Sequence, residues 1–314
     1  MSDRADAKVS DRMTRPSPWG PLAVADAHLH FFSHNFFSAL VGQKPGLTLE
    51  AAGEHLGWAL PPEAPEKLAE TWIHELDRHG VFASALIASV PGDEGSVTAA
   101  VRAFPNRFFA YAMVNPRALT AGLPATFSDI RVACLFPAMH GYSIQDDCAR
   151  PVFEWAQAHR RAVFVHCGVL SVGVRKKLGL PSPFDMRFSN PVDLHAVALR
   201  YPEVPIIVPH FGAGYFREAL MLADQCSNVY LDTSSSNQWM RYQAGHFTLR
   251  EVFRHALDVA GPQRLLFGTD SSFFPRGWHH AIFEDQAKAL YEIGTSEADA
   301  RAIFGENLLR ILAV

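Results

Sequence analysis

Cysteine is scarce in this chain of 314 residues, and the cysteines that are present lie far apart. The four are Cys134, Cys148, Cys167 and Cys226, and none belongs to a CxxC pair. This spacing argues against a framework of disulfide bonds. We therefore expect a cytoplasmic location, where thiols stay reduced.

The sequence also lacks an excess of basic charge and any long apolar run. Its 28 basic and 32 acidic residues give a net charge of −4, which argues against nucleic-acid binding. No apolar stretch approaches the roughly 18 residues that span a membrane. Residues 1–20 are polar and contain no apolar core of a signal peptide. We expect them to form a flexible tail preceding a single domain over 21–314.

Several motifs of nucleotide-binding and serine-hydrolase folds are absent. There is no GxxxxGK[ST] loop and no GxSxG turn. Gly212 and Gly214 are followed by Arg217 where a dinucleotide-binding loop requires a third glycine. These absences argue against an open, doubly wound sheet, which is the main alternative fold.

Eight short apolar runs are present, separated by helical patterns. The runs are continuous rather than alternating, as expected for strands that are buried on both faces of a parallel sheet. They cover residues 22–30, 81–89, 108–116, 132–137, 162–168, 205–212, 228–234 and 264–272. Eight such units over about 290 residues predict an α/β fold, a (β/α)8 TIM barrel. The connections over 31–65, 169–189 and 234–247 are long, and we expect them to surround the substrate.

The first strand ends in Asp26-Ala27-His28-Leu29-His30. Side chains alternate along a strand, so Asp26, His28 and His30 are expected to share one face. Two neutral imidazoles that converge on one point suit zinc, iron or a similar divalent metal. Two unrelated histidines would give the same short pattern, so later strands have to decide.

Metal-ligating residues recur at the ends of three later strands. His166 ends the fifth run, His210 the sixth and Asp270 the eighth. Each lies close to a glycine, which permits close approach of the backbone. A lone histidine is more often structural, but four strand ends with such residues at the catalytic face of a barrel favour a metal site.

These strand ends resemble those of the amidohydrolase superfamily. More narrowly, the chain is similar to the group of aminocarboxymuconate semialdehyde decarboxylase, which also contains sugar and pyrone lactonases and hydroxybenzoate decarboxylases. The segments PHFGAGYFREAL, NVYLDTS and AIFGENLLRIL contribute to the resemblance. It implies one divalent metal, zinc before manganese or iron, held by His28, His30, His166 and Asp270. It also implies that His210 and Asp270 are catalytic and take a proton from a metal-activated water.

Binuclear members of the superfamily bridge two metals with a carboxylated lysine on the fourth strand. This chain has no lysine between Lys67 and Lys176, and Cys134 occupies the expected place. A thiolate could bind a second metal, but free cysteine is among the most buried residue types. We therefore expect a small buried side chain there and a mononuclear site.

Substrate contacts are expected from four residues near the predicted loops: His140, Arg187, Arg276 and Trp278. Arginines in a pocket would bind an anionic, carboxylated small molecule. A solvated basic surface is the alternative interpretation. The sequence thus favours a metal-dependent hydrolase of an ester, lactone or amide. A metal-dependent decarboxylase is the second hypothesis and a non-catalytic binding barrel the third, and homo-oligomer formation stays open.

Overall fold

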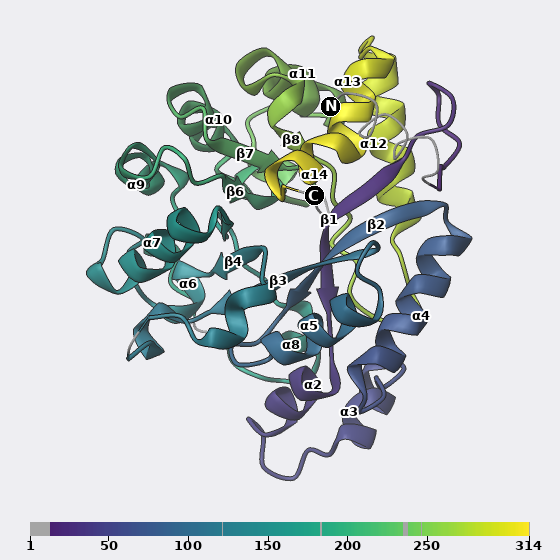
Figure 1. Cartoon of the computed structure of the whole chain (residues 1–314), viewed down its shortest axis with the longest axis vertical. Coiled ribbons are helices and arrows are strands. Elements are labelled where there is room, and N and C mark those ends of the chain that lie inside the picture. Colours follow the sequence, from purple (N-terminus) through teal and green to yellow (C-terminus); the bar gives the residue numbers. More distant parts are fainter. Residues whose placement is uncertain (1–12, 121, 183, 235–237, 246, 314) are drawn as a thin grey trace.

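The computed structural model describes residues 13–120, 122–182, 184–234, 238–245 and 247–313. Eight parallel strands pair in chain order and wind into a barrel, which confirms the predicted (β/α)8 fold (Figure 1). The strands are β1 (Val24–Phe31), β2 (Val81–Ala88), β3 (Phe108–Val114), β4 (Val132–Leu135), β5 (Ala162–Val165), β6 (Ile206–Val208), β7 (Val229–Asp232) and β8 (Leu265–Leu266).

The barrel closes between β1 and the segment that follows β8. The Ala27 amide donates to Phe267 O, and the Asp270 amide donates to His28 O at 2.9 Å. The His30 amide donates to Ser271 O at 2.7 Å. These bonds place Asp270 directly beside the two histidines of β1.

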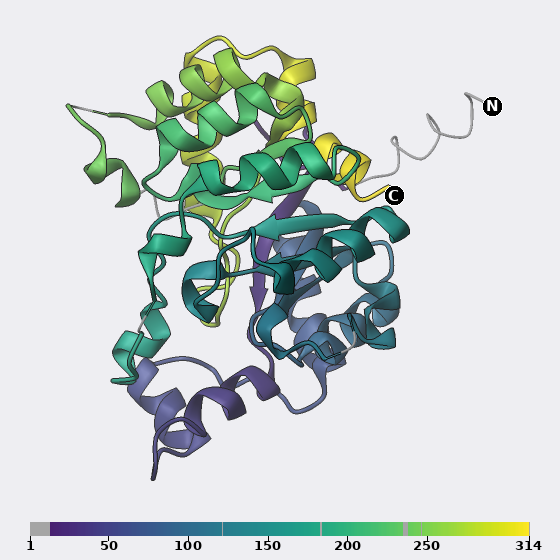
Figure 2. The same cartoon turned by 90° about the vertical axis from the view of Figure 1, so that its left-hand side faces the viewer.

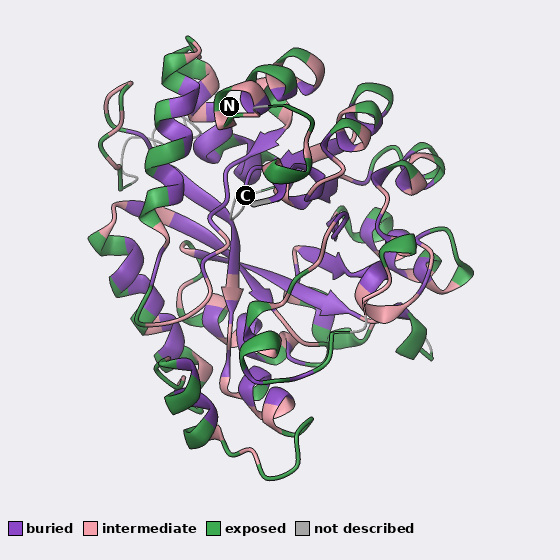
Figure 3. Ribbon diagram, turned by 180° about the vertical axis from the view of Figure 1, so that it is seen from behind, coloured by how far each residue is buried: buried purple, intermediate pink, exposed green. Residues whose placement is uncertain are grey.

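Helices cover the outside of the barrel, and their inner faces are buried (Figure 3). Between β3 and β4 the described residues form two 3-10 turns, Pro116–Ala118 and Ala125–Asp129, in place of an α-helix. The helices are α2 (His34–Val41), α3 (Leu49–Leu56), α4 (Pro65–Arg78), α5 (Glu94–Ala103), α6 (Pro137–His140), α7 (Arg150–His159), α8 (Gly173–Lys177), α9 (His195–Arg200), α10 (Phe216–Gln225), α11 (Leu249–Ala260), α12 (His280–Glu292), α13 (Glu297–Arg301) and α14 (Asn307–Ile311).

Local sequence signals explain where several of these helices begin. Thr248 caps α11, and with Glu251 it forms a complete capping box. Ser296 caps α13 by accepting a hydrogen bond from the Asp299 amide. Asn190 caps a 3-10 turn over Pro191–Leu194 that leads into α9. Each start satisfies backbone N–H groups that a helix leaves unpaired.

The barrel has separate inner and outer cores. The inner core contains small residues of β1 and β2 with Tyr111, Cys134 and Phe164, and α14 closes one end of it with Leu308 and Leu309. The outer core lies between strands and helices. Cys134 is fully buried, and burial raises the pKa of its thiol well above the usual value. These features fit the expected small buried side chain.

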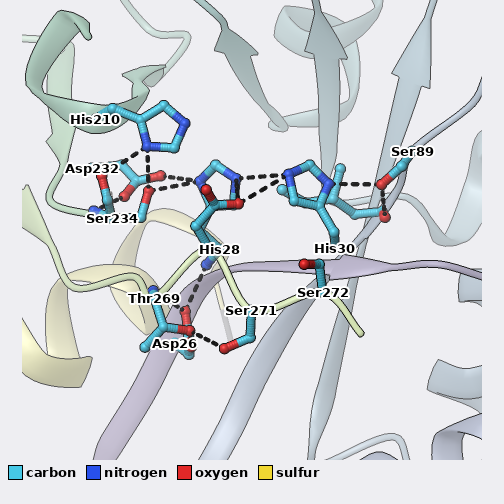
Figure 4. Close-up of polar contacts among 12 residues, drawn as sticks. Asp26, His28, His30, Ser89, His210, Asp232, Ser234, Thr269, Ser271 and Ser272 are labelled. Atoms are coloured by element: carbon cyan, nitrogen blue, oxygen red, sulfur yellow. Dashed lines mark hydrogen bonds and ion pairs between the residues drawn. The ribbon is translucent and has the colours of Figure 1, made fainter. Parts of the chain in front are cut away.

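A register shift in β1 overturns the prediction that Asp26 shares a face with His28 and His30. Asp26 pairs with Ser84 of β2, whereas Leu29 pairs with Leu86, so β1 holds one extra residue between the two points. Such a bulge interrupts the alternation of side chains. Asp26 consequently contacts Thr269 and lies apart from the two imidazole rings (Figure 4).

The long connections after β1 and β5 pack against each other beyond the barrel mouth. Phe36, Phe37 and Leu40 of α2 form one cluster with Leu56 of α3 and with residues of the β5 connection, among them Val174 of α8 and Leu178, which follows α8. Figure 2 shows α2 and α3 beside this connection at one end of the molecule. We call this layer, made of α2, α3 and α8, the cap.

The described residues before β1 contact the rest of the chain. The Trp19 indole donates to Thr295 O at 2.8 Å. The Arg15 guanidinium donates to His79 O at 2.7 Å and lies over the Trp278 and Phe283 rings. Residues 13–20 therefore pack on the barrel, and residues 1–12 lie outside the described part. No helix among the described residues is long and apolar enough to cross a membrane.

Candidate metal centre and active site

A cavity of about 870 Å³ lies between the barrel mouth and the cap. All five predicted metal-site and catalytic residues line it: His28, His30, His166, His210 and Asp270. They come from the ends of β1, β5, β6 and β8, because parallel strands of a barrel end on one face.

His28, His30 and Asp270 form the tightest group of potential ligands. The two Nε2 atoms of the histidines lie 3.3 Å apart. Oδ1 of Asp270 lies 3.3 Å from His30 Nε2 and 3.8 Å from His28 Nε2. The ligand atoms of these three residues all lie within 4.8 Å of one another.

The partners of the two rings explain why these atoms suit a cation (Figure 4). His28 Nδ1 donates to Asp232 Oδ2 at 2.6 Å. His30 Nδ1 lies 2.7 Å from Ser89 Oγ, whose own proton goes to Ile87 O. With both Nδ1 atoms engaged as donors, the neutral forms of the two rings point their Nε2 lone pairs at each other and at a carboxylate. A divalent cation satisfies all three acceptors, so the residues fit one.

His166 and His210 face the same cavity from β5 and β6. Their ring centroids lie 5.5 Å apart. His166 Nδ1 is buried and has no hydrogen-bond partner among the described residues, which leaves it free to accommodate a ligand. His210 Nδ1 lies 2.8 Å from Ser234 O, a carbonyl that can only accept, so Nε2 is the ring nitrogen with a free lone pair.

Burial and neighbouring charges set the protonation of the site. Burial lowers the pKa of His30, of His166 and of His210 below the usual value, so these rings are neutral near pH 7. Burial opposes ionisation of Asp270, but the neighbouring imidazoles of His30 and His28 hold its pKa well below the usual range. Burial also opposes the charged form of His28, but the Asp232 carboxylate raises the pKa of this ring above the usual value, so a cation has to compete with a proton at His28. The site therefore offers three neutral imidazoles, a fourth that can lose its proton, and an ionised carboxylate.

Backbone strain is concentrated at two of these residues. His210 has φ of 55° and Asp270 has φ of 57°. The left-handed region is unfavourable for residues with a Cβ, at a cost of about 1–3 kcal/mol. Strain of this kind is typical of functional sites because the surrounding fold has to hold it in place.

The four predicted substrate contacts divide into two pairs. His140 and Arg276 line the cavity. Arg187 and Trp278 do not: the Arg187 side chain is 83% exposed and pairs with Asp185, whereas the Trp278 indole is fully buried and donates to Asp26 at 2.8 Å. The positions of Arg187 and Trp278 in the sequence do not reveal that their partners are Asp185 and Asp26.

The cavity contains cations and aromatic rings that the sequence interpretation did not assign. Arg175, Lys177 and Arg241 line it together with Arg276. None of the four forms a salt bridge within the described part of the chain, and Asp270 is the single carboxylate among the described lining residues. The Trp58 and Phe273 rings stack with their centroids 3.9 Å apart, and the Phe32 and Phe36 rings stack with their centroids 4.0 Å apart. Asp232 was also missed, although its place at the end of a strand is the signal used for Asp270.

The fold is a barrel of parallel strands, and its potential metal ligands lie towards the carboxyl ends of those strands. Enzymes of this fold have their active sites at that face. Residues 25–314 match the family model described as amidohydrolase, so the chain belongs to the amidohydrolase family.

Solved structures share the fold at low sequence identity. A probable 2-pyrone-4,6-dicarboxylic acid hydrolase of Acinetobacter baumannii, with citric acid bound, has a TM-score of 0.60 and 14% identity, and the match covers 93% of this chain and 100% of that one. A 5-carboxyvanillate decarboxylase of Novosphingobium aromaticivorans, in complex with manganese and 4-hydroxy-3-methoxy-5-nitrobenzoic acid, has a TM-score of 0.61 and 13% identity over 96% and 99% of the two chains. The structural neighbours thus include hydrolases and decarboxylases.

One curated relative is similar over a short segment. Protein fluG of Emericella nidulans is 38% identical over 87 residues. The match covers 28% of this chain and 10% of fluG, so it spans about a tenth of that relative's length.

Proposed function

We propose that this protein is a metal-dependent hydrolase that cleaves an ester, lactone or amide bond of a small carboxylated substrate. The observation that carries the proposal is the convergence of His28 Nε2, His30 Nε2 and Asp270 Oδ1 within 3.3–3.8 Å at the barrel mouth. His166 would complete the ligand set. Zinc suits these nitrogen and oxygen donors, and manganese or iron is the alternative.

When bound, the cation supplies Lewis acidity to a water and to the carbonyl oxygen of the substrate. The chain's own residues handle the proton. Asp270 is ionised and can take it from the attacking water. His210 is neutral, with its Nδ1 held by Ser234 O, so Nε2 can accept that proton or donate one to the leaving group.

The charge of the cavity supports an anionic substrate. Arg276 donates to Asp270 O and Ser272 Oγ, bonds that leave its positive charge unneutralised at the cavity wall. Arg241 contacts Tyr242, and Lys177 lies 5.5 Å from the centre of the Trp58 ring. Cations beside stacked aromatic rings suit a planar carboxylate.

Labelled water tests the reaction type. The purified protein would be supplied with lactones and aromatic carboxylates in H2(18)O. Hydrolysis places the label in the product carboxylate. Release of CO2 without incorporated label would instead assign the protein to the decarboxylases, the second hypothesis, which the structural neighbours also include.

Elemental analysis of the purified protein tests the metal site. We expect close to one zinc or manganese ion per chain, because Cys134 is buried with a raised thiol pKa and no lysine occupies β4. Two ions per chain, lost together in Cys134→Ala, would overturn the mononuclear site. A metal-free, folded and inactive protein would favour the binding barrel.

A cytoplasmic location is part of the same proposal. All four cysteines are free, and Cys134, Cys167 and Cys226 are buried. Free thiols persist in a reducing compartment. Fractionation of the source cells with an antibody against this chain would test the location.

A further inference from the structure

The end of β7 holds two residues that contact the metal-site histidines without facing the cavity. Asp232 is fully buried, and its Oδ2 accepts from His28 Nδ1 at 2.6 Å. Ser234 O accepts from His210 Nδ1 at 2.8 Å. Neither Asp232 nor Ser234 lines the cavity, so neither is placed to touch substrate.

These contacts reach across the segment that follows β8, and Gly268 in that segment makes them possible sterically. A Cβ at Gly268 would lie 2.9 Å from Asp232 Oδ1, from the Cβ of His28 and from the Cβ of Ser234. Such contacts are too short for any side chain. The absence of a side chain at Gly268, just after β8, therefore lets the end of β7 contact β1.

Both oxygens of Asp232 are engaged. Oδ2 accepts from His28, and Oδ1 accepts from the Ser234 amide at 2.6 Å. An ionised carboxylate can only accept, so it holds the proton of His28 on Nδ1 and keeps the lone pair of Nε2 directed at the ligand group.

We propose that Asp232 and the Ser234 carbonyl are positioning residues that fix the ring tautomers of His28 and His210. The inference rests on the proposed metal site. Asp232 acts on metal affinity through His28, and the Ser234 carbonyl keeps Nε2 of His210 free. The end of β7 supplies no metal ligand itself, but it fixes the tautomer of a proposed ligand, His28, and of a proposed catalytic base, His210.

The variant Asp232→Asn separates this role from a structural one. The new amide oxygen can still accept from the Ser234 amide, and its NH2 group then points at His28 Nδ1. His28 has to accept there and carry its proton on Nε2, where it blocks the cation. All buried groups stay hydrogen-bonded, so the metal-free variant should keep its fold.

We expect Asp232→Asn to weaken the affinity for Zn²⁺ about 10- to 100-fold in titrations of the metal-free protein against a chelating indicator. Its metal-free melting temperature should stay within about 2 °C of the parent value. Ser234→Ala is the matched control, because it removes a hydroxyl beside the same rings but keeps the carboxylate and the carbonyl. Its loss should be roughly 3-fold or less, the size of one weak neutral hydrogen bond.

Wild-type affinity in Asp232→Asn would overturn the proposal, as would an equal loss in Ser234→Ala. Nitrogen NMR of the metal-free parent protein tests the tautomer in the unaltered chain, and the His28 signals are assigned by their absence in His28→Gln. A proton on Nδ1 of His28 supports the proposal, and a neutral ring protonated on Nε2 overturns it. If the parent protein binds no Zn²⁺, the proposed function fails, whereas the NMR result still decides the tautomer.

Discussion

At the scale of single residues, the partner of each side chain decides its role as much as its identity does. His28 and His30 have the same chemistry and sit two positions apart. A buried carboxylate holds His28, whereas a serine hydroxyl holds His30. Since a charged acceptor binds an N–H more strongly than a neutral one, the two rings differ in how firmly their tautomers are fixed.

Asp270→Asn should separate metal binding from catalysis. The amide oxygen can still reach the metal, but an amide cannot take a proton at neutral pH. We expect kcat to fall by about 10²- to 10⁴-fold while most of the metal is retained. Steady-state kinetics together with elemental analysis would measure both, and His210→Gln should behave alike. Turnover within about tenfold of the parent would contradict the assigned role.

Trp278→Phe should change stability rather than substrate affinity. Asp26 accepts from the His28 and Thr269 amides, the Thr269 hydroxyl and the Trp278 indole. Loss of the indole donor leaves a buried carboxylate short of one partner, at a cost of about 1–3 kcal/mol. Urea unfolding should show this cost, with KM unchanged. A raised KM at unchanged stability would instead support the substrate contact that the sequence suggested.

At the scale of elements, the sequence predicted the eight strands and the end of the barrel at which the candidate site lies. Eight buried runs become eight strands, and the residues that end them meet because all the strands run in one direction. The extra residue in β1 could not be predicted, since apolar patterning carries no register and Asp26 follows the same run as His28. The partners of Trp278 and Arg187 could not be predicted either, because both depend on how loops fold back on the barrel.

The loop after β8 and the connection after β5 allow a matched comparison of two arginines. Arg276 lines the cavity and has no salt bridge among the described residues, whereas Arg187 lies outside the cavity and pairs with Asp185. Arg276→Met should lower kcat/KM about tenfold or more, as loss of a charge-assisted contact implies. Arg187→Met should leave kcat/KM near the parent value. Equal effects in the two variants, or a preference for neutral esters, would refute the role of Arg276.

At the scale of the whole molecule, the two ends of the barrel differ in what fills them. At one end, α14 inserts Leu308 and Leu309 into an apolar core. At the other end, polar and strained residues surround a cavity that the cap covers. Strain of about 1–3 kcal/mol at Asp270 is tolerable because packing elsewhere stabilises the fold.

The proposed metal site also spans the line where the barrel closes. His28 and His30 belong to β1, and Asp270 follows β8, next to the backbone bonds that join the two edges. A cation held by all three would link the first strand of the barrel to the last. Metal binding should therefore stabilise this seam more than the rest of the barrel.

Removal of the metal should lower the melting temperature and loosen the seam first. A ligand present at 100 times its Kd stabilises the folded state by about 2.7 kcal/mol, which corresponds to roughly 4 °C for a domain of this size. Calorimetry with and without a chelator would measure the shift, and hydrogen exchange should accelerate at residues 24–31 and 265–271 before β3 to β5. His28→Gln should lose the chelator effect, whereas His210→Gln, which removes no proposed ligand, should keep it. If the chelator removes the metal but changes neither the melting temperature nor hydrogen exchange at residues 24–31 and 265–271, the metal lies elsewhere.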